Sequence, residues 1–170
     1  GIDTDIWDPE QDVLIAENYT VKKVVSGKRK NKHAIAKKYQ LDKDLPLLVF
    51  IGRFAREKGA DLLPQLIVNL QLHYSEKLNI FILGSGDETV QSDLEILIRK
   101  RAANLAVFFG YDEHLAHELY AGADFLFMPS RVEPCGLNQL YAMKYGTLPV
   151  VHAVGGLKDT VLDIQDGGYG

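Results

Sequence analysis

The stretch LLVFIG (47–52) decides the fold, because it is short, apolar at every position but the last, and ends in glycine. A strand with one face in water alternates apolar and polar residues, whereas a strand buried on both faces is apolar throughout. A helical pattern follows it, in which Leu63, Leu66, Ile67 and Leu70 recur at helical spacing. We therefore expect a strand inside a parallel sheet, followed by a helix.

The same order of strand and helix recurs along the rest of the chain. Further apolar runs predict strands at NIFILG (79–84), AVFFG (106–110), DFLFMP (124–129) and LPVVHA (148–153). Helical patterns lie between or beside them at DLEILIRKRAA (93–103), EHLAHELYAGA (113–123) and CGLNQLYAMKYG (135–146), and a Gly-Gly turn with a short helix follows the last strand. Five successive βα units predict an α/β fold, an open doubly wound parallel sheet of Rossmann-like type. Ligands of such sheets lie beyond the carboxyl ends of the strands.

The 170 residues have the usual length of one domain, which buries roughly 70% of its unfolded surface. The chain begins without Met and with turn residues, GIDTDIWDP, so we expect a fragment of a longer protein. Residues 1–45 are expected to form a connecting segment and a helix that pack on the domain. Residues 46–170 are expected to form the Rossmann-like domain itself.

The helix predicted within residues 1–45 is strongly basic. Eight Lys or Arg lie between positions 22 and 38, and Ser26 or Gly27 is expected near the helix start. These cations form either an anion-binding patch or a solvated helix face, and we favour the solvated face.

Composition excludes several classes of function. The chain is 46% hydrophobic and 25% charged, as in ordinary soluble proteins, and no apolar run approaches the roughly 18 to 20 residues that cross a bilayer. With 19 basic and 23 acidic residues, the net charge of −4 gives no electrostatic footprint for nucleic acid or anionic lipid. A single cysteine excludes an internal disulfide, and the N-terminus lacks a signal-peptide layout, so a reducing cytoplasm is expected.

Two cations follow the first predicted strand, in GRFAREKGAD (52–61). Arg53 and Lys58 lie five residues apart before a helix, and two cations at a helix N-terminus suit a diphosphate. Solvated surface residues are an equally good interpretation of the pair alone. Arg56 and Glu57 are expected to pair with each other.

Two familiar phosphate-binding motifs are excluded. LGSGDE (83–88) follows the second strand but has Thr89 where a dinucleotide fingerprint needs Gly or Ala, so a structural turn is favoured. The P-loop pattern is missing too, because Lys58 precedes its glycine.

The remaining strand ends carry groups that suit a sugar nucleotide. Tyr111 follows the third strand, where its ring could lie against a base, although an isolated Tyr more often packs. PSRVEPCG (129–136) follows the fourth strand and places Glu133 just before a helix N-terminus. VGGLKDT (154–160) follows the fifth, and its two glycines allow close backbone approach. Each signal is weak alone, but they converge on one edge of the sheet.

No histidine or cysteine pattern competes with this site. The five His lack metal-site spacing; His114 and His117 favour a solvated helix face over a zinc pair, and no metal is expected. Cys135 has no His nearby in sequence to activate it, so a small packing residue is favoured over a reactive thiol.

At these residues the chain resembles the nucleotide-sugar-binding half of the bacterial glycogen synthase and plant starch synthase family, glycosyltransferase family 5 of the two-Rossmann (GT-B) architecture. The matching stretches are GIDTDIWDP, GRFAREKGADLL, ILGSGD, GY, GGLKDTV and the 23-residue run PSRVEPCGLNQLYAMKYGTLPVV from Pro129. They span almost the whole chain. The family's N-terminal domain, with its Lys-Thr-Gly-Gly-Leu element and acceptor groove, and its final helix have no counterpart here.

The resemblance implies roles for individual residues. Arg53 and Lys58 match the basic pair on the diphosphate of ADP-glucose, Tyr111 the aromatic residue beside the adenine, and Glu133 the acidic residue of the sugar site. The remaining substrate-binding positions it implies are Cys135, Gly136, Leu137, Gly155, Gly156 and Leu157. Tyr141 stands where the wider retaining group has a second Glu, which favours the starch synthase branch and leaves the ribose contact unassigned.

The resemblance also implies the reaction. The parent protein is expected to transfer glucose from ADP-glucose to the non-reducing end of an α-1,4-glucan with retention and without a cofactor, in the cytoplasm or, in a plant, the plastid. The fragment alone is expected to be inactive. The alternatives are a UDP-sugar-dependent retaining transferase of sucrose- or trehalose-phosphate-synthase type and a non-enzymatic nucleotide-binding module.

Overall fold

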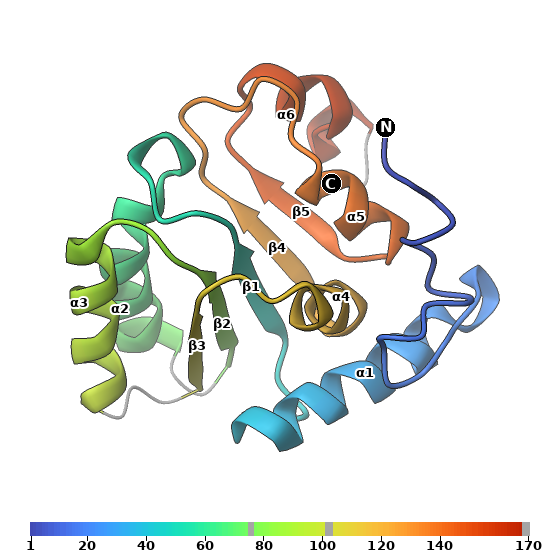
Figure 1. Ribbon diagram of the computed structural model, residues 1–170, viewed down its shortest axis with the longest axis horizontal. Coiled ribbons are helices and arrows are strands. Elements are labelled where there is room, and N and C mark those ends of the chain that lie inside the picture. Colours follow the sequence, from blue (N-terminus) through green and yellow to red (C-terminus); the bar gives the residue numbers. More distant parts are fainter. Residues whose placement is uncertain (75–76, 101–103, 168–170) are drawn as a thin grey trace.

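The computed structural model describes residues 1–74, 77–100 and 104–167, and a parallel sheet of five strands lies at its centre (Figure 1). The strands lie in the order β3-β2-β1-β4-β5, and every neighbouring pair is parallel. Their bounds are Leu47–Ile51 (β1), Asn79–Gly84 (β2), Leu105–Phe109 (β3), Phe125–Met128 (β4) and Leu148–Val151 (β5). The predicted doubly wound sheet is confirmed, and each strand ends within two residues of its predicted bounds.

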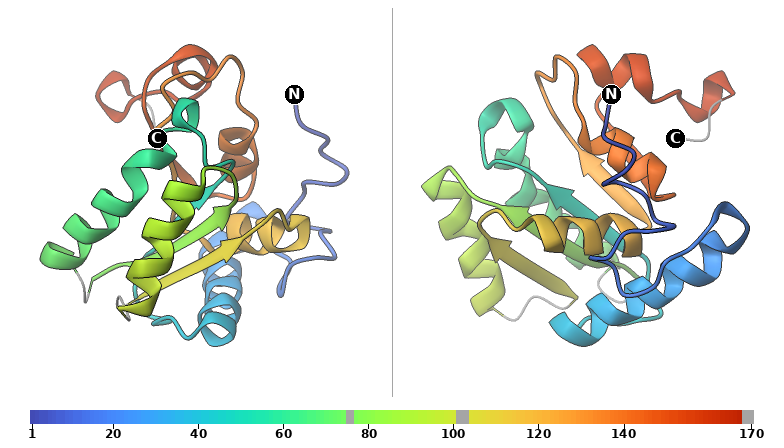
Figure 2. Two further views of the ribbon diagram at one scale, coloured as in Figure 1. Left: turned by 60° about the vertical axis from the view of Figure 1, so that its left-hand side comes forward. Right: turned by 45° about the vertical axis from the view of Figure 1, so that its right-hand side comes forward.

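Helices cover both faces of this sheet, as Figure 2 shows from two further sides. The helices are α1 (Val24–Tyr39), α2 (Leu63–Tyr74), α3 (Glu88–Arg99), α4 (Glu113–Gly122), α5 (Asn138–Lys144) and α6 (Gly155–Thr160). Short 3-10 turns span Val21–Lys23, Arg56–Lys58, Ala60–Leu62 and Ile164–Asp166. The predicted helix at 93–103 corresponds to α3, and positions 101–103 lie outside the described residues.

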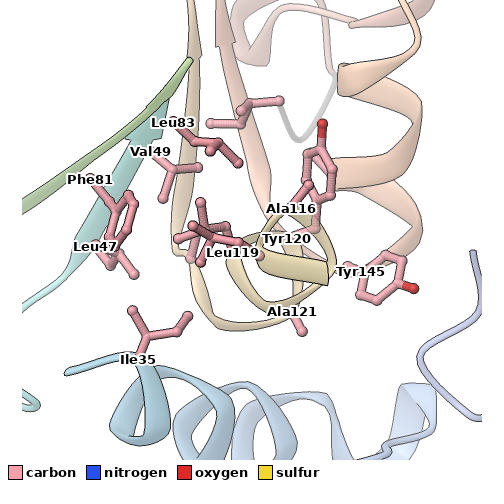
Figure 3. Packing of buried hydrophobic residues seen from close by; sticks show 14 of the residues in the cluster. Ile35, Leu47, Val49, Phe81, Leu83, Ala116, Leu119, Tyr120, Ala121 and Tyr145 are labelled. Atoms are coloured by element: carbon pink, nitrogen blue, oxygen red, sulfur yellow. The ribbon is translucent and has the colours of Figure 1, made fainter. Parts of the chain in front are cut away.

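Neighbouring residues of one strand belong to opposite layers of the core. Val49 packs with Leu119 and Tyr120 of α4, in the cluster drawn in Figure 3. Phe50 packs with Leu63 of α2, in a second cluster on the other face. Successive side chains of a strand point to opposite faces, so the strand is apolar throughout because both faces are buried.

Ser26 and Gly27 lie near the start of α1, as predicted, but neither caps the helix. The helix begins at Val24, so Ser26 and Gly27 lie inside it, and the capping residue Lys23 makes no side-chain cap. Gly27 is needed there because a Cβ atom at this position would lie 2.3 Å from the Cβ atom of Tyr19. Close packing of the preceding segment, and not capping, therefore explains this glycine.

The basic residues of α1 are not simply a solvated face. Lys30 and Lys38 form exposed ion pairs with Glu17 and Glu118. Two others contact the rest of the domain: Lys32 lies 3.0 Å from a carboxylate oxygen of Asp124, and Lys28 donates to backbone carbonyls in α4 and to that of Tyr145, just after α5. The solvated interpretation is wrong for those two, because α1 packs against α4.

The connecting segment packs on α4 and α5 through aromatic and charged groups. Trp7 stacks between the rings of His117 and Tyr141, with centroid distances of 3.7 and 3.9 Å. Asp12 lies 2.7 Å from Nδ1 of His117 and accepts a hydrogen bond from the hydroxyl of Tyr145. The solvated face predicted for His117 is therefore wrong, because the connecting segment covers it.

Candidate functional site

Strand order reverses between β1 and β4, whose carboxyl ends therefore diverge into a crevice. The loop after β1 carries Lys58, and the loop after β4 carries Glu133. The Lys58 ammonium lies 2.6 Å from Oε2 of Glu133, although the two residues are 75 positions apart. The cation and the carboxylate predicted from separate strand ends thus meet in one site.

This ion pair is largely removed from water. The side chains of Glu133 and Lys58 are 7% and 28% exposed. The hydroxyl of Ser130 donates to the same Oε2 atom at 3.2 Å. An ammonium has three donors. One is used on Glu133 and none on any other residue that the structure describes, so two are left for an incoming anion.

A small cavity of about 60 Å³ opens beside the pair. It is lined by apolar side chains from the ends of β1 and β4 and from Leu137, by backbone at two glycines and by four polar residues: Phe50, Ile51, Gly52, Lys58, Phe127, Met128, Ser130, Glu133, Gly136, Leu137 and Asn138. Apolar walls with a few convergent polar groups are typical of small-molecule sites. Its size suits one part of a ligand, such as a phosphate or a sugar edge.

The two loops of the site are tied to each other. The backbone N–H groups of Arg131 and Val132 both donate to the carbonyl of Glu57, at 2.8 and 3.2 Å. The guanidinium of Arg131 makes a bidentate pair with Asp61 and lowers the pKa of that carboxyl through the hydrogen bond. Lys58 and Glu133 are therefore held at a set separation by bonds that neither makes itself.

The predicted glycine pair makes a close backbone approach to the loop after β4, residues 129–136, which we call the motif loop. A Cβ atom on Gly155 would lie 2.2 Å from the carbonyl oxygen of Glu133, and one on Gly156 would lie 2.1 Å from that of Cys135. The N–H of Gly156 donates to the Glu133 carbonyl at 2.9 Å. The start of α6 thus supports the loop that carries the carboxylate.

Among the predicted site residues outside the cavity wall, Arg53 and Tyr111 lie on the exposed surface. Arg53 is 73% exposed and lies 2.9 Å from Glu57, and Tyr111 is 80% exposed. The predicted Arg56–Glu57 pair is therefore wrong, because the i,i+4 geometry brings Arg53 to Glu57 instead. The diphosphate role of Arg53 and the base contact of Tyr111 stay predictions.

The other predicted residues divide into three groups. Gly136 and Leu137 line the cavity just before α5. Cys135 is exposed, so the packing interpretation is wrong. Its backbone carbonyl accepts a hydrogen bond from the side-chain amide of Gln139. Leu157 is fully buried in the core, so only its backbone could meet a ligand.

Two polar residues of the cavity wall were missed in the sequence. Ser130 directly follows the end of the fourth predicted strand, and Asn138 opens α5, where its amide donates to the carbonyl of Ile51 at 2.7 Å. The rule that ligands lie beyond strand ends points to Ser130. Nothing in the spacing indicates the bond between Asn138 and β1.

The secondary motifs fit structural roles. Gly84 and Gly86 pack against the carbonyls of Gly52 and Phe54, which suits the structural turn predicted for LGSGDE. Within the described ranges, no group of three or more His, Cys, Asp or Glu could hold a metal ion. Among the same residues, no helix has both the length and the apolar character needed to span a membrane.

Fold and site together define an α/β domain with a charged cavity at its switch point, the place where doubly wound proteins bind nucleotide ligands. The chain belongs to the glycosyl transferases group 1 family, whose model matches residues 31–168.

Individual relatives sharpen this membership. The chain is 51% identical over 170 residues to a glycogen synthase of Flavobacterium johnsoniae, covering all of this chain and 36% of the relative. It is 46% identical over 163 residues to a glycogen synthase of Cellvibrio japonicus, covering 95% and 33%. The catalytic domain of starch synthase IV from Arabidopsis thaliana, solved bound to ADP and acarbose, is 36% identical with a TM-score of 0.88, covering 98% and 34%. The predicted family resemblance is confirmed, and the chain spans about a third of the length of these relatives.

Proposed function

We propose that this chain is the donor-binding domain of a retaining glucosyltransferase of the glycogen and starch synthase type. The parent protein would transfer glucose from ADP-glucose to the non-reducing end of an α-1,4-glucan, in the cytoplasm or, in a plant, the plastid. The observation that carries the proposal is the buried Lys58–Glu133 pair at the carboxyl edge of the sheet. The chain is 51% identical to a glycogen synthase, and this similarity supports glucose as the transferred sugar and an α-1,4-glucan as the acceptor.

The hard step is departure of the diphosphate. The bond between the glucose anomeric carbon and the phosphate oxygen breaks, and negative charge grows on the leaving group. Preorganised cations at that position are a large source of stabilisation. Lys58, with two free donors, and Arg53 on the same loop would supply it. The cofactor-free chemistry needs no metal.

Glu133 would bind sugar hydroxyls and would not attack the anomeric carbon. Its Oε2 atom already accepts bonds from Lys58 and Ser130, which makes the carboxylate a weaker nucleophile. The acceptor hydroxyl would form the new bond on the face the phosphate leaves, and its proton would pass to the departing phosphate oxygen. A glycosyl adduct trapped on Glu133 would contradict this mechanism.

The nucleotide would extend along the same edge of the sheet. Gly136 and Leu137 would approach it with their backbone, and Tyr111 would cover the adenine from the loop after β3. We expect the glucan to bind to parts of the parent protein beyond these 170 residues, so the chain alone should not extend a glucan.

Calorimetric titration with ADP, UDP and ADP-glucose tests the proposal. The wild type should prefer ADP to UDP and bind ADP-glucose more tightly than ADP. Glu133→Ala should lose only the glucose-dependent increment, because the carboxylate is assigned to the sugar. Glu95→Ala, at an exposed ion pair on α3, is the matched control.

The opposite outcomes have distinct meanings. A preference for UDP would favour a sucrose- or trehalose-phosphate-synthase type. Nucleotide binding with no glucose increment in the wild type would favour a non-enzymatic binding module.

A further inference from the structure

We propose that Ser130 is a positioning residue for Glu133: its hydroxyl fixes one carboxylate oxygen so that the other is presented to the glucosyl hydroxyls. The inference rests on the proposed function, and it assigns a role to a residue of the cavity wall that the family pattern left without one.

The two oxygens of Glu133 have different surroundings. Oε2 accepts from Lys58 at 2.6 Å and from Ser130 at 3.2 Å. Oε1 accepts no hydrogen bond from the residues that the structure describes, while the side chain lines the cavity. One oxygen is therefore held by the protein, and the other is left for a ligand.

Ser130 is itself fixed from two sides. It is 2% exposed, and its carbonyl accepts a hydrogen bond from Nδ1 of His152 at 2.9 Å. The N–H of His152 in turn donates to the carbonyl of Met128, the last residue of β4. Arg131, the residue after Ser130, donates its N–H to the carbonyl of Glu57. The hydroxyl is thus attached to a backbone that has little freedom to move.

The Ser130 hydrogen bond matters most when the sugar nucleotide is bound. Lys58 must then share its charge between Glu133 and the diphosphate, which weakens its hold on the carboxylate. The Ser130 hydroxyl has a single donor and uses it on Oε2, so it keeps Oε2 in place. Hydrogen bonds to charged groups are the stronger kind, and losing this one would let the carboxylate rotate away from the sugar.

The test is a double-mutant cycle in the full-length gene product, with affinities for ADP and ADP-glucose as readouts. Ser130→Ala should reduce the preference for ADP-glucose over ADP about tenfold, the lower range for a bond to a charged group. Its affinity for ADP alone should stay unchanged. In a Glu133→Ala background, Ser130→Ala should have no further effect on that preference, because the hydroxyl would have nothing left to position.

A second substitution guards against a folding defect. Ser130→Cys keeps nearly the same volume but offers only a weak donor, so it should behave as Ser130→Ala does. The inference is overturned if either variant keeps the full glucose increment, or if the loss is equally large with and without Glu133. If the wild type itself shows no glucose increment, the proposed function fails and this assignment fails with it, whereas a full increment in the Ser130 variants overturns the assignment alone.

Discussion

Lys58 and Glu133 illustrate how a charged pair can serve a site without a net charge. A buried carboxylate is costly unless it is paired, and Lys58 and Ser130 both bond to Glu133. The same ammonium has donors left for an anion. The two charges therefore compensate each other, and Lys58 would still have donors for the proposed diphosphate.

Lys58→Ala should reduce turnover of the full-length protein by about two to three powers of ten. The reason is that a lost contact to developing negative charge costs about 2.7 to 4 kcal/mol in the barrier, by analogy with an oxyanion donor. Initial rates of glucan extension measure it. Lys37→Ala, at an exposed position of α1, should leave the rate unchanged. Near-normal turnover in Lys58→Ala would remove this residue from the mechanism.

At the scale of elements, the start of α6 and the loop after β4 form one unit. Gly155 has a φ of +48°, which is unfavourable for residues with a side chain, and it lies directly against the Glu133 carbonyl. Backbone packing is enough to explain why small residues are needed here.

Gly155→Ala should weaken ADP-glucose binding at least about tenfold, because the new Cβ atom must displace the loop that carries Glu133. Gly167→Ala is the matched control: its φ is also positive, at +83°, but a Cβ atom there meets nothing within 4 Å. The control should cost only the left-handed strain of about 1 to 2 kcal/mol in unfolding free energy. Calorimetry and urea unfolding separate the two effects. Equal binding losses in both variants would refute the contact argument.

At the scale of the whole molecule, Lys28 joins the N-terminal helix to α4 and to the segment between α5 and β5. Its ammonium nitrogen lies 3.2 Å from the carbonyl oxygens of Tyr120, Ala121 and Tyr145 and 2.7 Å from the Thr147 hydroxyl, acceptors that its three donors share. Burial lowers the pKa of Lys28 to about 7; Asp124 opposes this shift and Lys32 adds to it. Protonation of Lys28 therefore makes the stability of the domain depend on pH.

Stability should rise with pH above about 7 because of Lys28. Its pKa is near 10.4 in an unfolded chain, so between the two values the unfolded state binds more protons. The free energy of unfolding then increases with pH, by up to about 1.4 kcal/mol per pH unit. The cost of burying the ammonium is fully present below pH 7.

Urea unfolding at pH 7, 8 and 9 measures this slope. Lys28→Met keeps the apolar stem and removes the charge, so its slope should be smaller than that of the wild type. The same slope in both proteins would show that Lys28 does not titrate in this range.

The sequence by itself determined the class of fold and the edge of the site. Strands such as LLVFIG are apolar at every position because both faces of a parallel sheet are buried, and that property is written locally in the chain. The position of Glu133 beyond a strand end followed from the same pattern, because all parallel strands end at one edge.

Only the tertiary structure decided which groups meet. It brought Lys58, and not Arg53, to Glu133, placed Gly155 under the motif loop, and buried His117 beneath Trp7. These contacts join residues that lie far apart in the chain, and periodicity carries information about which face a residue occupies but none about its distant partner. Pairing across 75 positions depends on how the strands are ordered and how the loops are tied, which packing of the whole domain settles.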